Sequence, residues 1–333
     1  MDEYLDYPCG PVRADKLDEC AAFVYQVVQR YSQPPWNIKY WEFWNEPDVA
    51  PEIVYVPDSP IGCWGDQDDP NYGGWYYAEM LKAVYPEVKR ADPDAKVLVG
   101  GLLLDCDPRD PALCIASYKG EGEAPPRFLR GILENGGKDY FDGVSFHAFE
   151  LYYGGFGMYG NANWDSSWNT TGPVILAKVD YLKELLNEFN ATGKLLLATE
   201  NAVLLNCDDD PNTETPPCPD EDAWEEMKAY YVAQTFAAAT RDKLHTNIWL
   251  SIYGWAGTGL LATDNTPLPA YHAYTISAQQ LFGVDYVRDI NEYPGVMGYE
   301  FRNASRHTWI IWSLDGSVHT IQLPSGLRAG YHV

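Results

Sequence analysis

The sequence has no apolar run long enough to cross a membrane. None of its apolar segments approaches the roughly 18–20 residues that a spanning helix needs. The first residues, Met1-Asp-Glu-Tyr, are acidic, and no apolar segment of a signal peptide follows them. We therefore expect no membrane partner and no leader within this chain.

Positive charge is also scarce. Lys and Arg total 23 residues against 48 Asp and Glu, which gives a formal net charge of -25. Such a charge repels phosphate backbones and anionic lipids, so nucleic acid is not an expected partner.

Metal-binding motifs are missing as well. The 6 histidines are scattered along the chain, and no CxxC or HxxxH spacing occurs. We expect neither a metal ion nor another cofactor.

Some of the cysteines occur at suggestive positions. Cys106 and Cys114 bracket one short polar loop, and Cys207 and Cys218 bracket another. This spacing predicts two local disulfides and hence an oxidising, extracellular location, because disulfides persist in such compartments. The alternative is a set of unpaired loop thiols.

Apolar and amphipathic segments alternate through most of the chain. The strand-like runs are 38–44, 96–101, 142–149, 194–200 and 246–255. Helix-like stretches lie before, between and after them, at 16–31, 76–91, 126–136, 173–190, 223–242 and 269–282. Nearly continuous apolar strands that alternate with helices predict an α/β fold with a parallel sheet covered by helices.

The pattern changes after residue 282. Short alternating segments follow without helices between them, at 284–290, 296–303, 307–314 and 317–323. They predict the start of an antiparallel β-sandwich. We therefore divide the chain into an α/β domain over 1–282 and an incomplete β-rich module over 283–333.

Two glutamates stand at the ends of predicted strands. Glu46 follows the run 38–44 in Trp44-Asn45-Glu46-Pro47, and Glu200 ends the run 194–200. Alternation places Glu42, Trp44 and Glu46 on one face, with Glu42 one layer deeper, where a buried acid would have a structural role. Each glutamate alone could be an ordinary surface residue. As a pair at the carboxyl edge of a parallel sheet, they match the two carboxyl groups of a retaining glycosidase, which lie about 5–5.5 Å apart.

Four motifs in order carry a family resemblance: WNEPD (44–48), SFHAF (145–149), ATEN (198–201) and YGW (253–255). With them the chain resembles the glycoside hydrolases of clan A, nearest to the family 39 β-xylosidase-like group. The resemblance implies a (β/α)8 TIM barrel in which Glu46 is the acid/base on strand 4 and Glu200 the nucleophile on strand 7. It also implies that Asn45 binds the sugar 2-hydroxyl.

The resemblance implies supporting residues too. His147 would point toward the sugar or the nucleophile, or else be a hydrogen-bonded histidine at the top of the barrel. Tyr253 and Trp255 would form an aromatic floor under the sugar, since the CH-rich face of a pyranose is apolar. The sequence departs from the family at Phe149, where relatives often carry a tyrosine, and at Asn201, where they often carry an aromatic residue.

In this mapping the five apolar runs are strands 4 to 8, and strands 1 to 3 are lacking. We therefore expect a chain truncated at both ends. The predicted function is a retaining O-glycoside hydrolase acting on β-linked poly- or oligosaccharide, with carbohydrate as its partner. A non-catalytic carbohydrate-binding barrel, or an inactive fragment, is the alternative. A metal-dependent hydrolase is a third possibility, for which only His147 stands at a suitable strand end.

Overall fold

A computed structural model of the chain describes residues 10–49, 62, 64, 66, 69–110, 127–152, 164–165, 168, 170, 172–207 and 217–325. The chain divides into two compact units. The first contains Met1–His147 and Asp180–Thr199, and the second contains Ala148–Val179 and Glu200–Val333.

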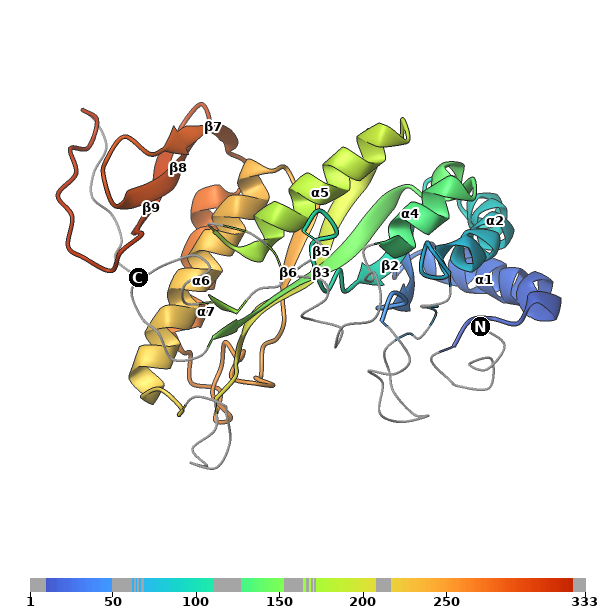
Figure 1. Cartoon of the computed structure of the whole chain (residues 1–333), viewed down its shortest axis with the longest axis horizontal. Coiled ribbons are helices and arrows are strands. Elements are labelled where there is room, and N and C mark those ends of the chain that lie inside the picture. Colours follow the sequence, from blue (N-terminus) through green and yellow to red (C-terminus); the bar gives the residue numbers. More distant parts are fainter. Residues whose placement is uncertain are drawn as a thin grey trace. The chain divides into compact units, whose positions relative to one another are not determined.

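The first unit begins with a short 3-10 turn, η2 (Ala14–Lys16), which leads into helix α1 (Leu17–Tyr31). Strand β1 (Tyr40–Asn45) and helix α2 (Gly74–Ala91) follow. Helix α1 lies beside α2 (Figure 1). Helix α2 buries an apolar face that includes Tyr77, Leu81, Val84 and Val88, at the spacing expected of a helix that covers a sheet.

Strand β2 (Lys96–Leu102) pairs with β1 in parallel, from Tyr40 opposite Lys96 to Asn45 opposite Gly101. The two strands approach closely at Gly100, where an added Cβ would lie 2.1 Å from the carbonyl oxygen of Phe43. A short helix, α4 (Arg127–Glu134), and a 3-10 turn, η4 (Gly137–Asp139), lead to the next strand.

Two strands are longer than their sequence patterns predicted. β3 (Gly143–Tyr152) continues five residues beyond His147, and β5 (Leu195–Leu205) continues five beyond Glu200. The prediction that these two residues end their strands was therefore wrong. In β5 the reason is that Ala202 and Val203 are fully buried, so apolar packing resumes after the polar pair and the strand continues.

Helix α5 (Val174–Glu188) separates β3 from β5, and a two-residue strand, β4 (Trp164–Asp165), pairs antiparallel with β3. The sheet follows the order β1-β2-β3-β5-β6, with β1 and β2, and β2 and β3, paired in parallel. These five strands coincide with the five predicted as strands 4 to 8. That strands 1 to 3 of a barrel are lacking remains a prediction.

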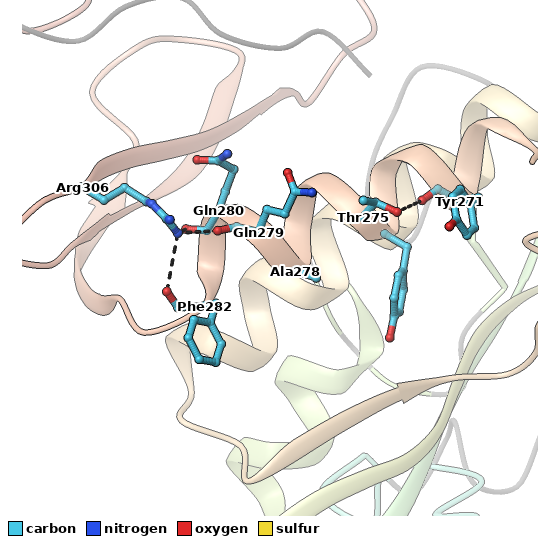
Figure 2. A pocket seen from close by; sticks show the side chains of 8 residues that line it. Tyr271, Thr275, Ala278, Gln279, Gln280, Phe282 and Arg306 are labelled. Carbon is cyan, nitrogen blue, oxygen red and sulfur yellow. Dashed lines mark hydrogen bonds between the residues drawn. The ribbon is translucent and has the colours of Figure 1, made fainter.

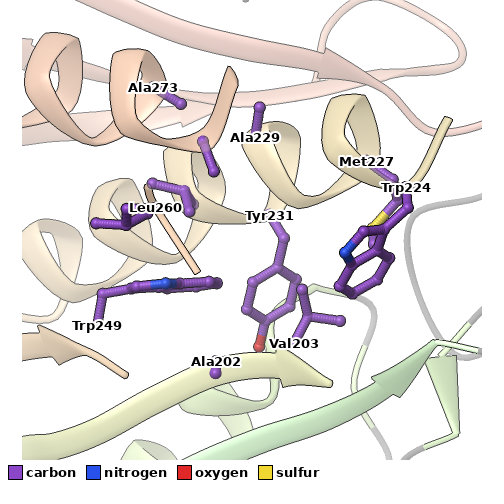
Figure 3. Packing of buried hydrophobic residues seen from close by; sticks show 11 residues of the cluster. Ala202, Val203, Trp224, Met227, Ala229, Tyr231, Trp249, Leu260 and Ala273 are labelled. Carbon is purple, nitrogen blue, oxygen red and sulfur yellow. The ribbon is translucent and has the colours of Figure 1, made fainter. Parts of the chain in front are cut away.

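The second unit contains helix α6 (Glu221–Arg241), strand β6 (Thr246–Trp249) and helix α7 (Pro269–Leu281). Asp220 caps α6, because its carboxylate accepts the backbone N–H of Asp222 at 2.8 Å. A buried cluster joins β5, α6, β6 and α7 (Figure 3). Its members are Ala202, Val203, Trp224, Met227, Ala229, Tyr231, Val232, Trp249, Leu260, Ala270 and Ala273.

The last part of the chain forms a separate antiparallel sheet in the order β7-β8-β9. Its strands are β7 (Asp285–Ile290), β8 (Val296–Arg302) and β9 (His307–Ser313). The fourth predicted strand, 317–323, was wrong, since no strand forms there and Val318 is fully exposed. A β-sandwich therefore remains a prediction.

The disulfide predicted between Cys207 and Cys218 is confirmed. Cys106 is also disulfide-bonded, whereas Cys114, its predicted partner, lies outside the described residues. Within the part of the chain that the structure describes, no helix is both long and apolar enough to cross a membrane.

Candidate active site

Glu46 lies directly after β1, where the backbone leaves the regular strand conformation. Trp44 and Glu46 adopt left-handed conformations with φ of 73° and 47°, which are uncommon for residues other than glycine. The Glu46 N–H donates to the carbonyl oxygen of Gly101 at 2.9 Å, so the turn is tied to the end of β2. The Glu46 residue is only 8% exposed. Asn45 is half-buried as the last residue of β1.

The expectation for Glu42 was wrong. Its side chain is exposed, although alternation placed it in a deeper, buried layer. Alternation is regular here, but exposed Tyr40 and Glu42 alternate with half-buried Trp41 and Phe43, so the face that carries Glu42 is the exposed face of β1.

His147 is the polar partner of Glu46. Its Nδ1 lies 2.7 Å from Oε1 of Glu46, and His147 is completely buried. The imidazole lies against Gly101, where an added Cβ would be 2.2 Å from Nε2. The glycine thus leaves the space that the ring occupies, and the ring in turn fixes the direction of the Glu46 carboxyl group.

Asp48 is a second buried carboxyl group in the same motif, and sequence reasoning assigned no role to it. Its oxygens accept the backbone N–H groups of Leu103 and Leu104 at 2.9 and 3.0 Å. Burial raises the pKa of Asp48 to about 7, against the two hydrogen bonds, which favour the charged form. The side chain ties the Glu46 turn to the segment after β2.

Glu200 is half-buried in β5 and is followed by a fully buried asparagine. The Nδ2 of Asn201 donates to Oγ1 of Thr235 at 2.6 Å and to Oδ1 of Asn247 at 2.8 Å. Asn201 therefore fixes the strand to α6 and β6 immediately after Glu200. The only sequence signal for this role was a polar residue in an otherwise apolar strand.

The structure brings two of the predicted site residues together within the first unit, Glu46 and His147. Glu200 is the first residue of β5 that belongs to the second unit. Two carboxyl groups can act as an acid and a nucleophile on one bond. Two carboxylates and an imidazole are also ligand types that hold a divalent transition metal.

Tyr253 and Trp255 lie in the segment after β6, which we call the platform loop and define as residues 253–259. Their side chains are 55% and 65% exposed. The Tyr253 hydroxyl donates to Oδ1 of Asn265. Two large aromatic rings that are this exposed offer flat apolar surfaces to a ligand.

Another buried carboxyl group belongs to Glu150 in β3. Its Oε2 accepts the backbone N–H of Val174 at 3.2 Å, and burial raises its pKa to about 7. Phe149, where relatives often have a tyrosine, packs against the buried cluster of Figure 3.

A groove of about 650 Å³ runs along α7 (Figure 2). Its lining residues are Tyr271, Tyr274, Thr275, Ala278, Gln279, Gln280, Phe282 and Arg306. The Arg306 guanidinium donates to the carbonyl oxygens of Gln279, Gln280 and Phe282 and so caps the end of α7. None of these side chains is a carboxyl group, so the groove offers no acid pair.

No family model matches the sequence, and no curated protein matches it. Solved structures do match. A family 39 glycoside hydrolase from the gut symbiont Bacteroides cellulosilyticus WH2 has a TM-score of 0.60 at 20% identity, over 92% of this chain and 54% of that one. A glucosidase from Croceicoccus marinus has a TM-score of 0.53 at 17% identity, over 89% of this chain and 52% of that one. The family 51 arabinofuranosidase from Xanthomonas axonopodis pv. citri has a TM-score of 0.52 at 13% identity, over 90% of this chain and 59% of that one.

The chain spans about half the length of these structures. At such low identity the similarity shows the fold, which is that of TIM-barrel-like glycoside hydrolases, with a five-stranded sheet followed by a β-rich segment.

Proposed function

We propose that this protein is a retaining glycoside hydrolase in which Glu46 is the acid/base and Glu200 the nucleophile. The observation that carries the proposal is the fixed carboxyl group of Glu46 directly after a parallel strand, where its Oε1 lies 2.7 Å from Nδ1 of the buried His147. Retaining enzymes place the pair about 5–5.5 Å apart, whereas inverting enzymes leave about 6.5–9.5 Å for a water molecule. We expect the shorter of these separations for Glu46 and Glu200.

The reaction proceeds in two steps. In the first, the Glu200 carboxylate attacks the anomeric carbon while the neutral Glu46 carboxyl group donates its proton to the leaving oxygen, which gives a glycosyl ester on Glu200. In the second, the Glu46 carboxylate takes a proton from water, and the resulting oxygen nucleophile displaces Glu200. Glu46 ends protonated again, and the sugar keeps its anomeric configuration.

We propose a β-linked poly- or oligosaccharide as the substrate. The structural neighbours named as a glucosidase and an arabinofuranosidase support a carbohydrate. Asn45, adjacent to the acid/base, would hydrogen-bond the sugar 2-hydroxyl, a contact that strengthens in the transition state. Tyr253 and Trp255 would stack on the apolar faces of the sugar rings.

We also propose an extracellular location. The Cys207–Cys218 disulfide and the disulfide state of Cys106 support it, because such bonds persist in oxidising compartments. The formal net charge of -25 favours a neutral substrate over a phosphate-bearing one.

The decisive experiment uses aryl β-glycosides and two variants. Glu200→Gln is expected to lower kcat by about 10³-fold or more, because the nucleophile is lost. Glu46→Ala is expected to lose most turnover with poor leaving groups, whose departure needs the acid. With an activated aryl glycoside, whose first step needs no acid, azide should replace water in the second step, restore turnover and yield a β-glycosyl azide. NMR should show that the wild-type protein releases the β-anomer first.

The matched control is Glu42→Gln, which changes an exposed carboxyl group on the same strand as Glu46. It should keep the wild-type rate. Full activity of Glu200→Gln would refute the proposed nucleophile. A wild-type protein that binds oligosaccharides without cleaving them would instead be the non-catalytic carbohydrate-binding barrel.

The same assay separates the acid pair from a metal site made of Glu46, His147 and Glu200. Prolonged treatment with EDTA should leave the rate of the wild-type protein unchanged. A rate that falls with EDTA and returns with added Zn²⁺ would favour metal-assisted hydrolysis.

A further inference from the structure

Hydrogen-bond donors from β5, α6 and β6 hold the backbone of the platform loop. The carbonyl oxygens of four successive residues, Ala256 to Gly259, each accept a bond from outside the loop. The donor to Ala256 is the backbone N–H of Leu205 in β5, at 2.9 Å. The indole N–H of Trp249 in β6 donates to Thr258 at 2.9 Å.

Helix α6 supplies the remaining donors. The Trp224 indole N–H donates to the carbonyl oxygen of Gly257 at 3.1 Å. The Lys228 Nζ donates to the carbonyl oxygens of Gly257 at 2.8 Å and Gly259 at 2.7 Å. Figure 3 shows the two indole rings and their nitrogen atoms within the buried cluster.

Lys228 is unusual because its ammonium group is buried and all its hydrogen-bond donors are used. Its third donor bonds Oε1 of Glu225 at 2.7 Å, and the side chain is 1% exposed. An ammonium group has three donors, and all three are used here, two of them on the loop. Burying a cation is costly unless every donor is satisfied. The buried lysine therefore needs the loop carbonyl oxygens as acceptors, and those oxygens need the lysine as their donor.

The loop also has little freedom to take another shape. Added Cβ atoms at Gly254 and Gly259 would lie 2.5 Å and 2.6 Å from the backbone nitrogen of the other residue. Gly257 has φ of 75°, and an added Cβ would lie 2.8 Å from Nε1 of Trp224. The backbone is therefore fixed in one conformation while the Tyr253 and Trp255 rings remain exposed.

We infer that Lys228 is a positioning residue for sugar binding: through its two bonds to the platform loop, it pre-organises Tyr253 and Trp255 as a rigid stacking surface. The inference rests on the proposed function. A rigid platform binds a sugar ring without first losing its own conformational freedom, so the lysine contributes to affinity without contacting the ligand.

The test compares Lys228→Met, which keeps the stem and removes the donors, with Lys243→Met at an exposed position just after α6. Hydrogen–deuterium exchange should show at least about tenfold faster exchange of the platform-loop amides in Lys228→Met, since local opening becomes easier. The exchange of α2, in the other compact unit, should not change, and Lys243→Met should match the wild type throughout.

Kinetics with a β-linked oligosaccharide provide the second readout. Lys228→Met should raise KM about fivefold to tenfold, the range that loss of aromatic stacking gives, while kcat stays within about twofold. Trp255→Ala should raise KM similarly. Adding Lys228→Met to the double variant Tyr253→Ala and Trp255→Ala should raise KM no further, because both rings are already gone.

The outcomes separate the two proposals. Unchanged loop exchange in Lys228→Met, or a further rise of KM when Lys228→Met is added to Tyr253→Ala and Trp255→Ala, would overturn the role of Lys228. Full activity of Glu200→Gln would overturn the proposed function instead, and the exchange result would still stand. If Lys228→Met does not fold, Trp224→Phe removes one donor to Gly257 and should give a smaller increase in the same exchange.

Discussion

The imidazole Nδ1 of His147 lies 2.7 Å from Oε1 of Glu46, and both residues are buried. The two residues are 101 positions apart in sequence, on β3 and at the end of β1. A carboxyl group that must donate a proton to a leaving group needs a fixed direction. The histidine provides that direction in the resting protein.

We predict that His147→Ala lowers kcat by about 10- to 100-fold, because the acid/base loses its orienting partner. KM for an aryl β-glycoside should change much less. The control is His272→Ala, at an exposed position on α7. Equal rates for His147→Ala and the wild type would show that the contact does not orient Glu46.

Gly101→Ala should produce a similar loss although no functional side chain is replaced. The added Cβ would lie 2.2 Å from His147 Nε2, so the ring must move away from Glu46. Gly136→Ala is the control for backbone strain, since its φ is 74° but nothing lies within 4 Å of the added Cβ. It should lower stability by up to about 1 kcal/mol and leave kcat unchanged. A Gly101→Ala variant with wild-type kcat would contradict the tight fit.

Glu150→Gln should flatten the pH dependence of stability. Burial raises the pKa of Glu150 from 4.5 to about 7, so the native state holds this proton more tightly than the unfolded state. The stability from this group is fully present below about pH 4.5 and is lost as the pH rises through 7. The shift corresponds to about 3 kcal/mol.

Urea unfolding of wild type and Glu150→Gln between pH 4.5 and 8 measures this slope. The pKa of Asp48 is also raised to about 7, so the stability of Glu150→Gln should still fall with rising pH, but less steeply than that of the wild type. Exposed Glu42→Gln should keep the full wild-type slope. A steeper fall of stability with pH in Glu150→Gln would contradict the assignment.

The double substitution Cys207→Ser and Cys218→Ser should lower the free energy of unfolding by about 2–3 kcal/mol, the entropy that a short closed loop removes from the unfolded chain. The bond closes a sequence separation of 11 residues. Activity of the folded variant should be unchanged, since neither sulfur belongs to the acid pair. Thermal unfolding with and without reductant measures the effect, and Cys20→Ser, at a free cysteine, is the control.

Much of the local structure could be predicted because it depends on short-range patterns. The amphipathic stretch 76–91 became α2, and 223–242 became α6, each within two residues at both ends. Strand ends were harder to predict. β5 passes through Glu200 because Ala202 and Val203 find buried partners that no local pattern reveals.

The sequence by itself determined the order of strands and helices and singled out Glu46 and Glu200, because periodicity and strand-end motifs are local properties of the chain. Only the tertiary structure decided which groups hold the site in place. The contacts that do so join residues far apart in the sequence. The separation is 101 positions for His147 and Glu46, 56 for Asp48 and Leu104, and 29 for Lys228 and Gly257. Such contacts depend on how buried polar groups find partners once the sheet and helices have packed, and no local pattern encodes that choice.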